Sequence, residues 1–439
     1  MKIYPRILKN VILPAVDRVL GTRYSYYLRQ FTVLQQSSRE QIEVWQQERL
    51  HRLILHVYKH VPFYRDFMQK ENLRPEDILK PADLRLFPEL TKAEIKACYE
   101  QFIPDNLNSY KYMRTATGGS TGMPFQYYLS LEAHSAVWAK KINMLEQHGF
   151  YLGEKYLALG SSQIVPNAKK SITSSVFHRL IRVQPLNAVN MDAAKCEVAI
   201  QMVKKQKLRM IYGYASAVYL LAKYVLENGV DLPVELCVTT SEKLTEQYEA
   251  VINQAFGCKV IDEYGARDAG VYSYRCSQGQ FHMVETCLYH LSGGGSAGRG
   301  AIVATNLVNY AMPLINYNLE DIITMNQDEC SCGAHSFCFE DILGRQSDVI
   351  ILSNGRTITG PAFTVLFSKL PVKCYQIAWK ENATLEIRIL PDAGYSKDTE
   401  AIICTAIKMH VGDDYRVVFN YEYEFAPLQN GKRNYFITG

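Results

Sequence analysis

The sequence predicts an α/β protein: a large N-terminal domain of β-sheets flanked by helices, followed by a small α+β domain. Three observations predict it. The first 105 residues have helical periodicity, short apolar runs alternate with helical stretches from about 110 to 345, and the pattern changes after Asp348. Alternation of this kind is typical of sheets covered by helices. The expected domains are therefore residues 1–347 and 348–439.

The helical lead-in is clearest between Leu50 and Val61, where apolar residues recur at i, i+3, i+4, i+7, i+8 and i+11. This spacing forms one face of a helix, which Pro62 ends. In the alternating region we expect a helix at 131–147 and strands at 156–159, 210–212, 236–239 and 260–261. In the last part we expect strands at 375–379, 385–389 and 416–419, and a helix at 399–410.

Composition narrows the function classes. The chain has 439 residues, 48% of them hydrophobic, and a net charge of +4, which is too small to indicate a nucleic-acid partner. Residues 1–60 hold ten Lys and Arg against four Asp and Glu. The apolar run Val11–Val16 is too short for a signal peptide or a membrane span. A helix packed on its own domain is the favoured interpretation of this basic segment, and peripheral contact with an acidic membrane is the alternative.

Eleven cysteines are scattered from Cys98 to Cys404, an odd number in a long chain. A secreted disulfide framework would be denser and would occupy a smaller chain. We therefore expect a cytoplasmic protein whose thiols are reduced or hold a metal.

The segment Thr117–Pro124, TGGSTGMP, combines three glycines with three hydroxyl side chains. Glycines allow backbone N–H groups to converge on an oxyanion, and hydroxyls add donors, so the segment could cradle phosphate. No lysine follows Gly122, so the common nucleotide loop is not matched. From this segment alone, a tight turn remains the alternative.

Four more segments carry unusual chemistry, although each alone could be an ordinary loop. The first, YGARD, combines an aromatic ring, an open backbone and a carboxylate. The second has two adjacent acids, the third could be a hinge, and the fourth has a lysine beside a glycine. They are Tyr264–Asp268, Asn316–Asp321, Gly344–Asp348 and Pro427–Lys432.

In this order the five segments resemble the adenylate-forming enzymes, and most closely the phenylacetate–CoA ligase-like branch that includes the CapK-like proteins of capsular polysaccharide biosynthesis. TGGSTGMP is the most specific piece. Three further segments support the resemblance, which covers essentially the whole chain: His60–Arg65, Thr240–Leu244 and Pro313–Tyr317.

The resemblance implies a role for each matching residue. The loop would hold the phosphates of ATP, Tyr264 and Gly265 would contact adenine, and Asp321 would bind the ribose hydroxyls. Asp268 would bind Mg²⁺ or contact phosphate, and Lys432 would reach the α-phosphate and the acyl carboxylate. The further matches are the loop residues Thr117, Gly118, Gly119, Ser120, Thr121 and Gly122, the nucleotide-bordering Ser241, Glu242, Ala266 and Arg345, and the hinge residue Asp348.

Several positions depart from the family pattern. Arg267-Asp268 replaces the usual Thr-Glu, Glu320 replaces a Gly before the ribose-binding acid, and Asn318 stands where the branch often has Arg. The acyl pocket is expected on loops such as the one containing Tyr212, Gly213 and Tyr214.

A metal site is expected from Cys276, His282, Cys330 and Cys332, three thiolates and one imidazole of the kind that hold tetrahedral zinc. Similar Cys and His positions occur in part of the same branch. His335 and Cys338 are competing ligands, and free buried cysteines are the alternative. Four protein ligands indicate a closed, structural site.

The implied activity is ATP-dependent activation of a small carboxylic acid as an acyl-adenylate, with pyrophosphate released and coenzyme A as the acceptor. One alternative acceptor is an amine or hydroxyl of a polysaccharide precursor. A non-catalytic, zinc-stabilised nucleotide-binding protein is a third interpretation. The implied cofactors are ATP, Mg²⁺, structural Zn²⁺ and coenzyme A, and a homodimer is left open.

Overall fold

The structure is a computed structural model. It describes residues 3–117, 125–160, 178–188, 191–294, 298–325, 329–345, 349–351, 357–359, 367, 370–380, 384–411, 415–421 and 436–438.

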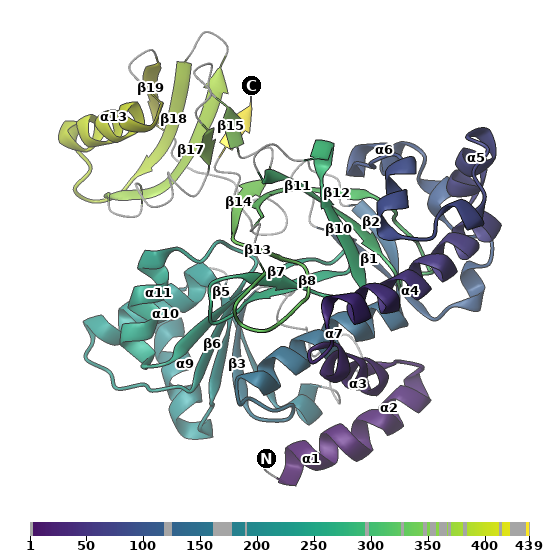
Figure 1. Cartoon of the computed structure of the whole chain (residues 1–439). Helices are drawn as coiled ribbons and strands as arrows, with labels where there is room; N and C mark the ends of the chain where they lie inside the picture. The colour runs from purple at the N-terminus through teal and green to yellow at the C-terminus, as the bar shows by residue number, and fades with distance from the viewer. Residues whose placement is uncertain are drawn as a thin grey trace.

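The first hundred residues are helical, as predicted (Figure 1). The long helix α4 buries Leu50, Leu53 and Val57 completely and ends at His60, and Pro62 begins the next helix. Ser38 and Gln41 form a capping box that fixes where α4 begins. The helices are α1 Ile3–Ile7, a π-helical turn Leu8–Ile12, α2 Leu13–Leu20, α3 Tyr24–Leu34, α4 Arg39–His60, α5 Pro62–Lys70 and α6 Lys92–Ala97, with 3₁₀ turns at Pro75–Asp77, Pro81–Leu86, Tyr99–Phe102 and Leu107–Ser109.

Among the described residues, eight strands form the main sheet in the order β13-β9-β8-β7-β6-β5-β3-β4. The strands from β4 to β7 are parallel, and those from β7 to β13 are antiparallel. The bounds are β3 Tyr156–Gly160, β4 Val183–Asn187, β5 Met210–Tyr214, β6 Leu236–Thr240, β7 Lys259–Ala266, β8 Val271–Arg275, β9 Phe281–Met283 and β13 Cys338–Phe339.

Helices cover both faces of this sheet, because successive strand residues point to opposite sides. Met210 faces the core shared with α7 and the N-terminal helices, whereas Ile211 faces the core formed with α9, α10 and α11. The bounds are α7 Leu131–Gln147, α9 Ala193–Gln206, α10 Ala215–Glu227 and α11 Glu246–Phe256. The helix predicted at 131–147 is confirmed at both ends.

A second, antiparallel sheet lies beside the first in the order β10-β11-β12-β14 (Figure 1). Strand β12 is irregular: Val303 pairs with Asn318 and Ala301 pairs with Ile322, so residues 319–321 stand opposite Ile302 alone. This bulge bends the strand at its middle. The bounds are β10 Cys287–Leu291, β11 Arg299–Asn306, β12 Tyr317–Thr324 and β14 Asp341–Arg345; a separate hairpin pairs β1 Tyr112–Thr117 with β2 Phe125–Ser130.

The C-terminal part has its own sheet, β19-β18-β17-β20, covered by helix α13. Ile377 and Ile387 of the sheet and Ile403 of the helix are fully buried in a separate core. This agrees with the α+β pattern expected from the sequence. The bounds are β15 Val349–Ile351, β16 Thr357–Thr359, β17 Val372–Lys380, β18 Thr384–Pro391, α13 Lys397–Val411, β19 Arg416–Tyr421 and β20 Phe436–Thr438.

Within the described ranges, every helix is too short or too polar to cross a membrane.

Candidate active site

Two residues expected to contact the nucleotide meet although they belong to different sheets. Tyr264, near the end of β7, donates a hydrogen bond from its phenol to Oδ2 of Asp321 on β12, at 2.7 Å. The ring of Tyr264 is half-buried and meets Phe339 edge to face. Asp321 also pairs in backbone register with Arg345 on β14. The segments expected to contact adenine, ribose and the Gly-Arg position therefore converge.

The bulge in β12 contains one of the departures from the pattern of the family that the sequence resembles. Glu320 stands where a glycine is usual and has a φ of +61°, in the left-handed region that glycine enters most easily. Its N–H donates to Oδ1 of Asn318 at 2.8 Å. Asn318, itself a departure, thus supports the strained residue two positions further along the strand.

Asp268 is buried and already has two partners. Tyr317 donates a hydrogen bond to its Oδ2 at 2.9 Å, and the ammonium of Lys92 lies 3.3 Å from the same oxygen. The neighbouring Arg267 is exposed. Sequence reasoning missed Lys92, because a lysine opening a short helix is usually a solvated side chain and carries no distinguishing pattern.

The carboxyl ends of the central parallel strands lie side by side. Tyr214 at the end of β5 pairs with Thr240 at the end of β6, which pairs with Glu263 on β7. Ligands of open α/β sheets bind outside such strand ends. Ser241 follows at once, with a φ of +66°. Glu242 accepts a hydrogen bond from the N–H of Ser216, at the start of α10. The expected pocket and nucleotide-bordering residues therefore share one edge.

A polar network that the sequence did not reveal lies beside the pocket residue Tyr212. Lys141 stands 3.4 Å from the centre of the Tyr212 ring and 3.2 Å from a carboxylate oxygen of Glu263. Tyr272 donates to the other oxygen of Glu263 at 2.8 Å. Burial, and then the charge of Glu263, raise the pKa of Tyr212 and of Tyr272 well above the usual value. Both phenols therefore stay protonated donors. Lys141 and Tyr272 lie far from Tyr212 in the chain, which explains why no motif linked them to it.

Gly213 is required by close packing between strands. A Cβ at this position would lie 2.4 Å from the carbonyl oxygen of Leu159 on β3. A side chain here would therefore push β5 away from β3 and displace Tyr212 and Tyr214.

The four expected metal ligands come together at the edge of the main sheet. One ligand atom from each of Cys276, His282, Cys330 and Cys332 lies within 4.8 Å of the others. Nε2 of His282 is 3.2 Å from Sγ of Cys332, and the two sulfurs of Cys276 and Cys330 are 3.6 Å apart. The competing candidates His335 and Cys338 lie outside this cluster.

The chemistry of this cluster fits zinc. Burial lowers the pKa of His282 to about 4, so the imidazole is neutral and can act as a ligand. Its Nδ1 lies 3.1 Å from Oγ of Ser336, a contact of the kind that orients metal-binding histidines. Burial raises the pKa of Cys330 to about 12, so without a cation this thiol stays protonated. A bound metal would have to supply the charge that stabilises the thiolate.

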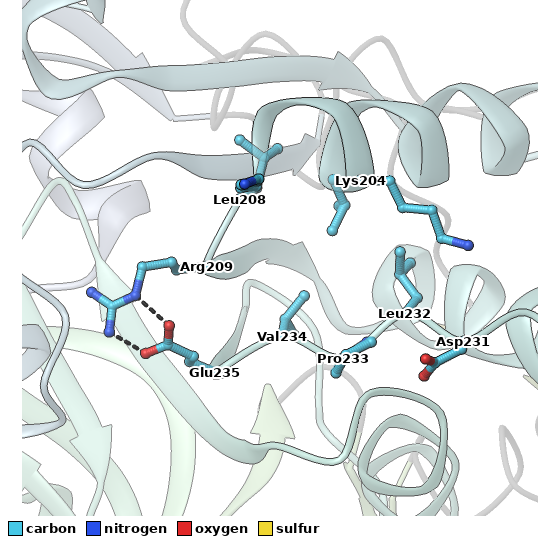
Figure 2. Close-up of a pocket in the computed structure, with 10 residues that line it drawn as sticks. Lys204, Leu208, Arg209, Asp231, Leu232, Pro233, Val234 and Glu235 are labelled. Atoms are coloured by element: carbon cyan, nitrogen blue, oxygen red, sulfur yellow. Dashed lines mark hydrogen bonds and ion pairs between the residues drawn. The ribbon is translucent and has the colours of Figure 1, made fainter.

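A surface hollow of about 300 Å³ lies at the other end of β5 and β6, next to Met210 and Leu236 (Figure 2). The Arg209–Glu235 ion pair lines one side of it. Lys204, Leu208, Leu232 and Pro233 line the rest. Because it borders the amino ends of the strands, it is separate from the site described above.

Some expected site residues lie outside the described residues: Gly118, Gly119, Ser120, Thr121, Gly122, Asp348 and Lys432. Thr117 and Arg345 are described as backbone, at the ends of β1 and β14.

Known proteins share a distant similarity with this chain. No family model matches the chain. CapK of Staphylococcus aureus is 24% identical over 310 residues, covering 70% of this chain and 68% of CapK. The phenylacetate-coenzyme A ligase of Thermus thermophilus is 23% identical over 374 residues, covering 79% of this chain and 80% of that ligase.

A solved structure shares the fold. The 2-hydroxyisobutyryl-CoA ligase, in the postadenylation state with R3-HIB-AMP, superposes with a TM-score of 0.70 at 15% identity, over 92% of this chain and 91% of that one. The mixed α/β fold with several sheets is thereby confirmed. The chain is therefore distantly similar to CapK and to the phenylacetate-coenzyme A ligases, and it shares the fold of the 2-hydroxyisobutyryl-CoA ligase.

Proposed function

We propose that this enzyme activates a small carboxylic acid with ATP and then transfers the acyl group to coenzyme A. The observation that carries the proposal is the contact of Tyr264 with Asp321 at the carboxyl edge of the parallel strands. An aromatic ring beside a carboxylate suits an adenosine, because the ring can stack on the base while the carboxylate accepts from the ribose hydroxyls. The structurally similar 2-hydroxyisobutyryl-CoA ligase was solved in complex with R3-HIB-AMP.

The reaction follows from where charge develops. An oxygen of the substrate carboxylate attacks the α-phosphorus, a P–O bond forms, and the bond to pyrophosphate breaks. Residues Thr117–Gly122 would donate backbone and hydroxyl hydrogen bonds to the phosphates, and Lys432 would stabilise the charge on the α-phosphate. A magnesium ion held by Asp268 would neutralise the leaving pyrophosphate. Most of the remaining acceleration comes from positioning.

Two kinds of acceptor could take the acyl group in the second step. The similarity to two coenzyme A ligases supports a thiol acceptor. The similarity to CapK supports the alternative of an amine or hydroxyl on a polysaccharide precursor. The contact between Tyr264 and Asp321 supports turnover over a degenerate nucleotide-binding protein, because both residues are in place for a nucleotide.

We propose that residues 348–439 form a lid that moves relative to residues 1–347. The separate core of the C-terminal sheet supports this, because an independent core allows the unit to rotate without unfolding. Lys432 would enter the site with the lid for adenylation. Its withdrawal would admit the acceptor.

We propose that Cys276, His282, Cys330 and Cys332 hold a structural zinc. The cluster joins β9 to the segment before β13, and thereby closes the loop that contains β10, β11 and β12. A metal there would hold the second sheet, and with it Asp321, against the main sheet.

We also propose that the N-terminal helices contact an anionic membrane surface. Their inner side is packed: Leu8 and Leu13 are buried, and Lys9 pairs with Glu146 at 2.5 Å. Their outer side carries Ile3, Val11 and Val19, which are 79%, 62% and 76% exposed. The exposed Arg6 and Arg18 lie on the same helices. Exposed apolar and basic side chains in the same helical segment suit acidic lipids.

The zinc proposal predicts a metal dependence of stability. Purified protein should carry about one equivalent of zinc, and Cys332→Ser should lower the melting temperature, because one ligand of a folding site is lost. Cys404→Ser, which removes a half-buried thiol far along the chain, is the control. Metal analysis and thermal unfolding measure both; zinc-free protein with wild-type melting would refute the site.

The membrane proposal predicts sedimentation with vesicles that contain phosphatidylglycerol, and weaker binding at high salt. The double substitution Ile7→Asp and Val11→Asp should abolish it, whereas Val198→Asp, on an exposed part of α9, should not. A wild-type protein that stays in the supernatant would contradict the proposal. A doubled mass in light scattering would then assign the face to a dimer.

The ribose assignment predicts that Asp321→Ala weakens ATP binding roughly tenfold to hundredfold, the scale of a lost charge-assisted hydrogen bond. Tyr264→Phe is the matched control, because it removes the hydrogen bond to Asp321 but keeps the ring. It should retain most of the affinity. Calorimetric titration measures the ATP affinity of both variants. An unchanged dissociation constant in Asp321→Ala would refute the assignment of Asp321 to the ribose.

The lid proposal predicts that Lys432→Ala slows acyl-adenylate formation by two or more orders of magnitude, the effect of removing one electrostatic donor worth roughly 2.7–4 kcal/mol. ATP affinity should change little. Lys408→Ala, an exposed lysine on α13, is the control. Pyrophosphate release with a substrate acid reports the step. Pyrophosphate release at the wild-type rate from Lys432→Ala would show that this lysine has no catalytic role in adenylation.

A further inference from the structure

A lysine from the helical N-terminal segment reaches the proposed phosphate side of the site. The ammonium of Lys92 lies 3.3 Å from Oδ2 of Asp268, whose side chain is 7% exposed. The same ammonium is 5.9 Å from the centre of the Phe125 ring. Phe125 is the first described residue after the glycine-rich segment 117–124. Lys92 therefore contacts Asp268 and lies near the first residue of β2.

The backbone before Lys92 is fixed to strand β12. The N–H of Leu90 donates to the carbonyl of Asn316, and the N–H of Asn318 donates to the carbonyl of Leu90, each at 2.9 Å. The side-chain amide of Asn316 donates to the carbonyls of Leu84 and Phe87. These contacts hold the segment that leads into α6. Lys92 is thus a positioned side chain, unlike an ordinary surface lysine.

The charges around Asp268 require a cation when no metal is bound. A buried carboxylate is costly unless it is paired and hydrogen-bonded, and Tyr317 and Lys92 supply these contacts. An ammonium has three N–H donors, and the side chain of Lys92 is 23% exposed. Among the described residues, Asp268 is the carboxylate that this ammonium pairs with, so donors remain for an incoming anion. A phosphate beside Asp268 alone would be repelled, whereas beside the pair it meets a neutral site with a free donor.

We propose that Lys92 is a phosphate ligand of the nucleotide site: it pairs with Asp268 while no metal is bound, and it donates to phosphate oxygens of the nucleotide. This inference rests on the proposed function. It assigns to the N-terminal helical segment a direct part in binding the nucleotide. The motifs at the strand ends gave no indication of this part.

A distinctive consequence concerns metal-free nucleotide. Without Mg²⁺, Lys92 offsets the charge of Asp268 and donates to the phosphates. With Mg²⁺ in excess, the metal would also neutralise Asp268 and the phosphates. Loss of Lys92 should therefore weaken metal-free ATP more than it weakens Mg²⁺-bound ATP. A purely structural role would weaken both forms equally.

The experiment is calorimetric titration of the full-length protein with ATP, AMP and pyrophosphate, each in chelator and in excess Mg²⁺. Lys92→Met keeps the length of the side chain without its charge, and Lys96→Met is the control on the same helix. We expect Lys92→Met to lose at least tenfold in metal-free ATP affinity and less with Mg²⁺, with Lys96→Met unchanged. Lys92→Arg should restore most of the affinity. The losses for AMP and pyrophosphate identify which phosphates Lys92 contacts.

The double variant Lys92→Met with Asp268→Asn separates phosphate binding from folding, because it removes the unpaired buried charge. Its melting temperature should recover while its metal-free ATP affinity stays low. Recovery of both, or equal losses with and without Mg²⁺, or no loss in Lys92→Met, would overturn the inference. A wild-type protein that binds neither ATP nor AMP would instead refute the proposed function.

Discussion

The irregular strand β12 is the element on which the rest of the site depends. Its first residue, Tyr317, forms a bridge to Leu90 of the helical segment and donates a hydrogen bond to Asp268. Its bulge presents Asp321 to Tyr264 on the main sheet. One strand thus joins the helical segment, the loop after β7 and the second sheet. A regular strand would place successive side chains on alternating faces throughout, without the bend at residues 319–321.

Much of the fold could be predicted, because helix starts and strand patterns depend on residues that are near one another in the chain. The helix at 131–147 has a strong start in Ser130, whose hydroxyl accepts from the N–H of Ala133. The strand expected at 260–261 in fact spans Lys259–Ala266. The apolar pattern underestimates its length, because Asp262 and Glu263 are polar residues that are nevertheless buried. Thr239 donates to Asp262, and Lys141 pairs with Glu263. Such partners lie far away in the chain, so the pattern of apolar residues stops where the strand continues.

The candidate site divides in the same way. Six residues could be predicted, because each belongs to a motif of fixed residue types: Tyr264, Asp321, Cys276, His282, Cys330 and Cys332. The structure brings Tyr264 to Asp321, and it separately gathers the four metal-ligand candidates. Lys92 and Lys141 could not, because a lysine's function depends on which carboxylate it meets in space. The sequence does not show what the departures at Asn318 and Glu320 do to the backbone. The structure shows a positive φ at Glu320 and a hydrogen bond from its N–H to Asn318.

The central claim is that the acid displaces pyrophosphate from ATP, and an oxygen label tests it most directly. A substrate acid labelled with ¹⁸O in its carboxylate is converted with ATP and an acceptor, and the AMP produced is examined by mass spectrometry. Attack of the carboxylate on the α-phosphorus leaves one labelled oxygen in the phosphate of AMP once the acyl group has been transferred. The account predicts labelled AMP. Unlabelled AMP, or label in orthophosphate, would contradict it.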